Sequence, residues 1–132
     1  GTMTDSVGLA SYGIDDWPYA TYADQGKISI NGGEFSILKP NPEFDGVYAL
    51  PYRAITPKIE ECTNLLVPVC CSASHIAMTS IRMEPVWVIL GQSAGQAATQ
   101  SLRENVPVQK ISVGDLQKTL IAQEQKISWS GK

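Results

Sequence analysis

Polar and apolar residues alternate over residues 27–30 and 34–38, on either side of an Asn-Gly-Gly sequence at 31–33. Alternation with a period of two is typical of a strand with one buried face, and Asn and Gly supply the positive φ angles that tight turns require. These residues therefore predict a β-hairpin. A further short strand is predicted at residues 47–50, because prolines on both sides oppose helix. The first fifty residues are expected to be rich in β-structure.

The pattern changes from about residue 53 onward. The apolar run at residues 65–69 predicts a short buried strand, with Pro68 near its end or at a sheet edge, since proline cannot donate to a ladder. A loop of small residues is expected at 70–75. In open α/β sheets, ligands bind beyond the carboxyl ends of the strands. This loop is therefore the first candidate for a site.

The main helix is predicted at residues 85–102, with Pro85 at its first position and Glu84 just before it. The first half is apolar on nearly every side, which is typical of a buried helix. The middle contains glycine, serine and alanine, which would let another backbone or a flat ligand approach closely. Tight packing of the helix on a sheet explains these small residues equally well.

A last helix is expected to start at Ser112, whose side chain can cap the amides near Asp115. Its buried face would contain Val113, Leu116 and Leu120. The residues from 125 onward carry no strong pattern.

Composition limits the class of protein. The 132 residues suffice for one domain, and 43% apolar with 17% charged residues is ordinary for a globular chain. A net charge of −3 without a basic cluster disfavours nucleic-acid binding. No apolar run approaches the roughly 20 residues that span a bilayer, so no membrane segment is predicted. No signal peptide pattern is present, and the parent protein could be exported, periplasmic or cytoplasmic.

Three cysteines, Cys62, Cys70 and Cys71, cannot all pair within one chain. Free thiols that pack as small apolar side chains are the simplest interpretation. A disulfide between Cys62 and Cys70 is the alternative if the parent protein is exported. Zinc bound with His75 is disfavoured, because the short Cys-x-x-Cys hooks of structural zinc sites are missing. No metal site is predicted.

The sequence Gly-Gln-Ser-Ala-Gly at 91–95 matches the G-x-S-x-G pattern around the catalytic serine of α/β-hydrolases. Those enzymes place the base histidine after the serine, whereas the only histidine here, His75, comes before it. Ser93 is therefore not expected to be a nucleophile. The chain also has no G-x-G-x-x-G and no Walker lysine loop, so it lacks its own cradle for a dinucleotide pyrophosphate.

The remaining motifs are Pro-Tyr-Arg-Ala-Ile-Thr-Pro-Lys at 51–58, Asn-Leu-Leu-Val-Pro-Val at 64–69, Ser-Ala-Ser-His at 72–75, Ser-Ile-Arg-Met-Glu-Pro at 80–85 and Leu-Gly-Gln-Ser-Ala-Gly-Gln-Ala-Ala at 90–98. In this order and spacing the chain resembles the C-terminal region of FAD-dependent oxidoreductases of the two-dinucleotide-binding-domain flavoprotein class. The specific resemblance is to the bacterial family sometimes labelled as xanthan lyases. It covers about residues 50–105 and is weaker at 5–8 and 12–16.

This resemblance implies an α/β (or α+β) fold that is the incomplete C-terminal part of a Rossmann-type flavoprotein. Residues 1–50 would end a β-rich, substrate-side segment, and residues 51–132 would form the C-terminal part of the FAD-binding domain. The chain would supply one wall of the FAD site, with the missing N-terminal FAD-binding region as its partner. Alone, it is expected to be inactive, not to bind FAD stably, and to form a homodimer through exposed apolar surface. A non-enzymatic binding or structural domain is the alternative.

The resemblance also indicates the residues of the flavin site. The candidate cofactor-binding residues are Ser80, Ile81, Arg82, Met83, Pro85 and Gly91. A helix starting at Pro85 would direct its positive end at the flavin, although Arg82 could instead pair with Glu84. Family members often have a histidine near position 16, and this sequence has none there, so no role is transferred. The catalytic candidates are His75, because histidine is the side chain that most often transfers protons in enzymes, and Arg53.

Overall fold

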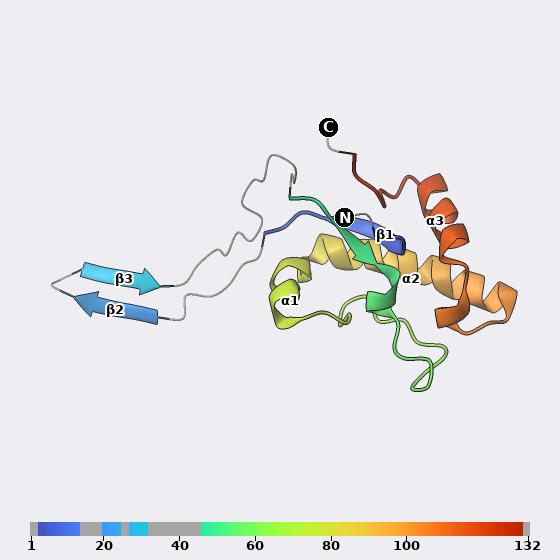
Figure 1. Ribbon diagram of the computed structural model, residues 1–132, viewed down its shortest axis with the longest axis horizontal. Coiled ribbons are helices and arrows are strands. Elements are labelled where there is room, and N and C mark those ends of the chain that lie inside the picture. The colour runs from blue at the N-terminus through green and yellow to red at the C-terminus, as the bar shows by residue number, and fades with distance from the viewer. Residues whose placement is uncertain (1–2, 14–19, 25–26, 32–45, 131–132) are drawn as a thin grey trace.

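The computed structural model describes residues 3–13, 20–24, 27–31 and 46–130. The strands in these residues are β1 (Ser6–Ala10), β2 (Ala20–Asp24), β3 (Lys27–Asn31) and β4 (Tyr48–Pro51). The helices are α1 (His75–Ile81), α2 (Glu84–Glu104) and α3 (Val113–Ala122), with short 3₁₀ turns η1 (Tyr52–Ile55) and η2 (Val108–Lys110). This mixed α/β architecture confirms the predicted fold class (Figure 1).

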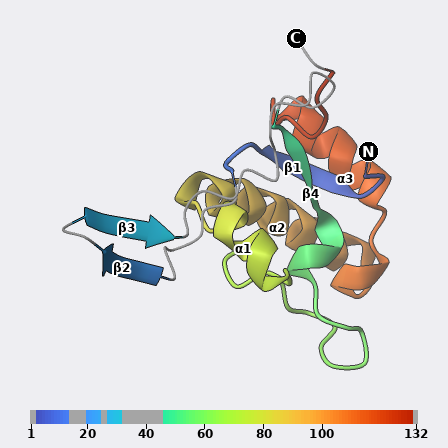
Figure 2. The same ribbon diagram turned by 60° about the vertical axis from the view of Figure 1, so that its left-hand side comes forward.

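Strands β1 and β4 form an antiparallel pair that lies against α2, and α3 packs beside α2 and β1 (Figures 1 and 2). The register places Gly8 opposite Leu50 and Ala10 opposite Tyr48. Between Ser6 and Gly8 the register shifts, so Val7 lies in a β-bulge. A bulge interrupts the ladder and leaves backbone groups that need other partners.

One face of α2 forms the centre of the core. Val86, Leu90, Ala94 and Ala97 recur at helical spacing and are buried together with Val7 and Leu50 of the strands. Tyr52 is also buried, and its hydroxyl donates to the Val108 carbonyl oxygen at 2.7 Å. Burial raises the pKa of Tyr52 to about 12. This contact holds η1 against η2 across 56 residues of sequence.

The ends of the long helices follow local sequence signals. α2 begins one residue before the predicted start, so Pro85 is its second residue. It ends at Asn105, whose left-handed conformation (φ 53°) is one that asparagine tolerates. α3 is capped as predicted, because the Ser112 side chain accepts from the Asp115 amide at 3.3 Å. Leu116 and Leu120 are fully buried, and Val113 is partly buried against the core.

One predicted strand is wrong, and one predicted hairpin is only partly within the described residues. The run at 65–69 is a loop in which Leu65 and Val69 are 46% and 47% exposed. The Val67 amide of this loop donates to the Ile55 carbonyl oxygen at 2.8 Å, and no strand lies alongside the loop in the described part of the chain. The hairpin predicted between residues 27–30 and 34–38 stays a prediction, because its second strand is not among the described residues. In those residues β3 pairs with β2. Residues 32–45 lie outside the described residues.

The helical region differs from expectation in two further respects. His75, predicted to end a loop, begins α1, and the Ser74 side chain caps this helix by accepting from the Ala77 amide at 3.2 Å. In α2, Val88 is 70% exposed, so the first half of this helix is not buried on every side. Within the described residues, none of the helices has the length and apolar character needed to cross a bilayer.

Candidate functional site

The junction between α1 and α2 contains most of the expected flavin-contacting residues. Ser80 and Ile81 are the last two residues of α1, Arg82 is its C-cap, and Met83 is the N-cap of α2. Pro85 follows in the first turn of α2. The sequence therefore folds these five residues into one tight corner, because Ser74 starts a short helix and Pro85 favours the start of the next.

The members of this corner differ in accessibility. Arg82 and Pro85 are exposed and Met83 is half-buried, so all three can contact a bound molecule. Ser80 and Ile81 are buried in the core. Gly91 lies further along α2, with no other atom within 4 Å of where a Cβ would stand. The open surface at Gly91 permits the close approach of a flat ring.

The hydroxyl of Ser80 connects three parts of the chain. It forms short hydrogen bonds with the hydroxyl of Tyr48 and with the carbonyl oxygen of Tyr12. Burial raises the pKa of Tyr48, and the hydrogen bond between Tyr48 and Ser80 lowers it to a smaller extent. The observed contacts join α1 to β4 and to the residues after β1, whereas contact of Ser80 with a flavin stays a prediction.

The first turn of α2 has few free backbone amide donors. Pro85 has no amide hydrogen, and the amides of Val86 and Trp87 both bond to the Met83 carbonyl oxygen, at 2.9 and 3.4 Å. The carboxylate of Glu84 adds negative charge to the same turn. A phosphate-binding helix terminus needs several free amides and positive potential. This terminus therefore lacks the free amides and the positive potential that a pyrophosphate site needs.

Trp87 supplies an unused donor in that turn. Its indole Nε1 is buried and has no hydrogen-bond partner in the described part of the structure. A buried donor without a partner costs about 1–3 kcal/mol. The fold thus leaves one buried donor without a partner in this turn, and contact of the corner with a flavin stays a prediction.

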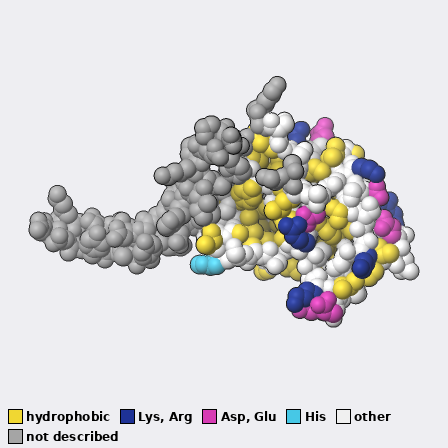
Figure 3. Space-filling view, viewed as in Figure 1, with side chains coloured by type: hydrophobic (Ala, Val, Ile, Leu, Met, Phe, Trp, Pro, Cys, Tyr) yellow, Lys and Arg dark blue, Asp and Glu magenta, His cyan; other side chains and the backbone are white. Residues whose placement is uncertain are grey.

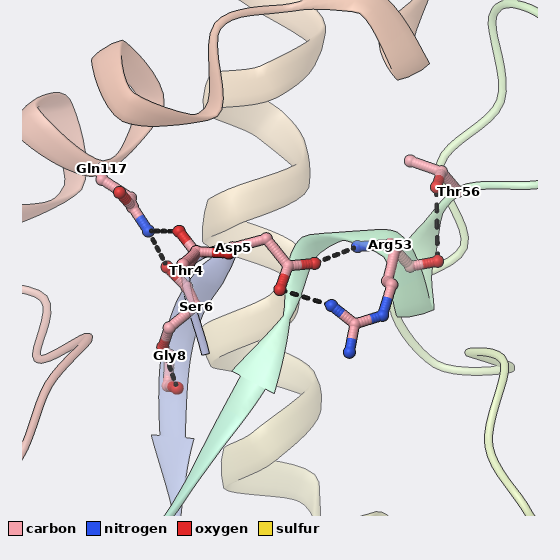
Figure 4. Close-up of polar contacts among 7 residues, drawn as sticks. All are labelled: Thr4, Asp5, Ser6, Gly8, Arg53, Thr56 and Gln117. Carbon is pink, nitrogen blue, oxygen red and sulfur yellow. Dashed lines mark hydrogen bonds and ion pairs between the residues drawn. The ribbon is translucent and has the colours of Figure 1, made fainter. Parts of the chain in front are cut away.

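Arg53 forms an ion pair with Asp5, with 2.5 Å between Nη1 and Oδ1, and the Arg53 amide donates to the other carboxylate oxygen at 3.4 Å (Figure 4). The Arg53 side chain is 65% exposed. Exposed pairs of this kind contribute about 0–1 kcal/mol to stability. The pair fixes the start of β1 next to η1, and a catalytic role for Arg53 stays a prediction.

His75, the other catalytic candidate, is the first residue of α1 and is exposed. Figure 3 shows this only histidine of the sequence at the molecular surface, in cyan. Access to solvent and to a second molecule is compatible with proton transfer. Its role in catalysis stays a prediction.

The serine of the G-x-S-x-G sequence, Ser93, lies in the core and forms hydrogen bonds there. Ser93 is fully buried, and its hydroxyl lies 2.9 Å from the Val7 carbonyl oxygen and 3.0 Å from that of Ile89. The amide group of Gln125 donates to the Ser93 oxygen at 2.7 Å. Because the bulge at Val7 interrupts the ladder, Ser93 and Gln125 supply hydrogen bonds at this position. The sequence reasoning missed Gln125, since nothing local connects it to Val7.

Ser93 is expected to be inert towards a fluorophosphonate probe. The hydroxyl is buried and already hydrogen-bonded, so a probe cannot approach its oxygen. Intact-mass spectra of the chain before and after incubation with the probe should be identical. A mass increase that disappears in Ser93→Ala would contradict this assignment.

The three cysteines are free thiols. Cys62 is half-buried, Cys70 is exposed and Cys71 is buried, and burial raises the pKa of the Cys71 thiol. The described residues contain no group of three His, Cys, Asp or Glu side chains placed to hold a metal ion.

Comparison with known proteins identifies the family. The model of the family described as FAD dependent oxidoreductase matches residues 1–120 of the 132. No curated protein and no solved structure matches the chain. The match includes every motif on which the resemblance was based, from residues 51–58 to 90–98. The chain therefore belongs to the FAD dependent oxidoreductase family.

Proposed function

We propose that this chain forms one wall of the FAD site of a larger oxidoreductase and is inactive alone. The family match over residues 1–120, in a sequence without a G-x-G-x-x-G fingerprint, carries this proposal. FAD, when bound, supplies the redox chemistry, and the protein supplies binding and orientation. A non-enzymatic binding or structural domain is the alternative.

The corner between α1 and α2 supports the proposal. Arg82, Met83 and Pro85 would contact the flavin from the corner, and Gly91 would allow the ring to lie close to α2. The unused Nε1 donor of Trp87 is suited to a carbonyl oxygen or ring nitrogen of such a ligand. The corner would orient the flavin and exclude water from one side of it.

The division of the chain is part of the same proposal. Residues 1–50 would belong to the substrate-side segment and residues 51–132 to the FAD-binding domain. The pairing of β1 with β4 and their packing on α2 would then be the connection between the two parts. The ion pair between Asp5 and Arg53 lies at that connection.

The exposed apolar side chains support the proposal that the isolated chain lacks a partner. Val88 of α2, Ile76 of α1, and Leu65 and Val69 of the loop are all exposed. Figure 3 shows hydrophobic side chains reaching the surface at several places on the face in view. Apolar patches of this kind on soluble proteins are commonly interaction sites. We propose that the upstream FAD-binding region covers them in the parent, and that a second copy covers them when the chain is alone.

The purified chain is expected to be colourless after incubation with FAD and desalting, because it lacks the glycine-rich cradle that holds the pyrophosphate. The measurement is the visible flavin absorbance per mole of protein. The matched sample is the longer protein encoded by the parent reading frame, including the region upstream of this chain. This protein should retain FAD stoichiometrically. A yellow chain would contradict the fragment proposal. A longer protein that retains no flavin would favour the non-enzymatic alternative.

A further inference from the structure

The edge of β1 that faces away from β4 has carbonyl groups without strand partners. Among the described residues β1 and β4 form a two-stranded sheet, so each of them has one edge that no described strand covers. An open edge can pair with a strand of another molecule, and proteins commonly cover such edges with a helix or loop. The uncovered edge of β1 could therefore pair with a strand of another molecule unless another part of the chain covers it.

Side-chain amide groups of two glutamines donate hydrogen bonds to backbone carbonyl oxygens at the start of β1. Gln117 of α3 donates to the carbonyl oxygens of Thr4 and Ser6, at 3.0 and 2.9 Å (Figure 4). Gln125 donates to the Val7 carbonyl oxygen at 2.5 Å. Three backbone acceptors at the start of β1 are thus bonded by two glutamines, and neither glutamine belongs to the sheet.

The tail after α3 completes this cover. Glu124 has a left-handed conformation (φ 65°), and the backbone amide of Gln125 donates to the Leu120 carbonyl oxygen. This arrangement turns the chain away from the helix axis. The tail then lies beside β1, where the Ser6 hydroxyl donates to the Ile127 carbonyl oxygen at 2.6 Å (Figures 1 and 2). Ile127 is partly buried against the core. We call residues 123–130 the C-terminal strap.

We propose that the C-terminal strap prevents the outer edge of β1 from pairing with a strand of a second copy of this chain. The strap follows the residues that the family model matches. The strap contacts β1 through the Gln125 side chain, which donates to the Val7 carbonyl oxygen, and through the Ile127 carbonyl oxygen, which accepts from the Ser6 hydroxyl. Removal of the strap takes away both contacts and uncovers this side of β1, while Ser93 still donates to Val7 and β1 stays paired with β4.

The test compares the full chain with Gln125→Ala and with a chain that ends at Ala122. Sedimentation velocity over a range of concentrations gives the mass, and native-state amide hydrogen exchange reports on Val7 and Leu9. At low concentration, Gln125→Ala should accelerate exchange of these amides by about three- to tenfold for each hydrogen bond lost, and Gln125 makes two, to the Val7 carbonyl oxygen and to the Ser93 oxygen. At high concentration both variants should form larger species than the full chain, in which these amides become protected.

Gln96→Ala is the matched control, because Gln96 is a half-buried glutamine of α2 that gives β1 no hydrogen bond in the described structure. It should behave as the full chain does. A synthetic peptide of residues 121–132 should reverse the association of the shortened chain. The proposal is overturned if mass and exchange stay unchanged in Gln125→Ala, or if the mass rises while the β1 amides stay unprotected. If the shortened chain does not fold, Gln125→Ala decides between these outcomes.

Discussion

Replacing Leu90 with alanine is expected to lower the free energy of unfolding by about 2–5 kcal/mol. Leu90 is 1% exposed at the centre of the buried face of α2, where it packs within the same core cluster as Val7 and Leu50. The substitution removes its buried methyl and methylene groups and leaves a cavity that the strands can fill only in part. Urea denaturation followed by circular dichroism measures the loss.

Leu102→Ala is the matched control, because Leu102 lies on the same helix and is 82% exposed. The same atoms are removed and helix propensity changes in the same direction, so the two variants differ mainly in burial. Leu102→Ala should change the free energy of unfolding by no more than about 0.5 kcal/mol. Equal losses in the two variants would show that the described core is not the one that stabilises the chain.

The long helices could be predicted from the sequence because their signals are local. Pro85 marks the first turn of α2, Ser112 caps α3, and the burial of Leu116 and Leu120 follows from their spacing. The missed helix α1 also has a local signal, since Ser74 is a favourable N-cap residue. It is only seven residues long, and helices this short depend on packing more than on propensity.

The strands could be predicted less well, because their pairing depends on distant residues. β1 pairs with β4 across about forty intervening residues, and nothing near Ser6 indicates this partner. The run at 65–69 has the composition of a buried strand but no neighbouring strand in the described structure. A strand needs a partner for its backbone groups, so the apolar pattern alone was insufficient.

The candidate site shows the same limit. The resemblance indicated the sequence from Ser80 to Pro85, and the fold places it in one corner. It could not indicate that Tyr48 engages the Ser80 hydroxyl, because these residues meet only through the packing of α1 near β4. The structural role of Ser93 was partly foreseen, since the position of His75 excluded a hydrolase triad.

The second large effect is expected at Gly8, where alanine should lower the free energy of unfolding by about 1–3 kcal/mol. A Cβ at Gly8 would stand 2.3 Å from Cγ2 of Ile89, which is closer than two carbon atoms can approach. Ile89 cannot easily move aside, because β-branched side chains have one strongly preferred rotamer in a helix. β1 would have to lift from α2. Urea denaturation of Gly8→Ala measures the cost.

Two further variants show whether this contact is the cause. Gly95→Ala places the same methyl group on α2 with no atom within 4 Å, so it should stabilise the chain by about 0.4–1 kcal/mol, because alanine has less conformational freedom to lose. Ile89→Ala removes the atom that Gly8→Ala would meet, so the second substitution should cost less in that background. A cost for Gly8→Ala that is the same with and without the Ile89 side chain would mean that the strand and helix are not in contact there.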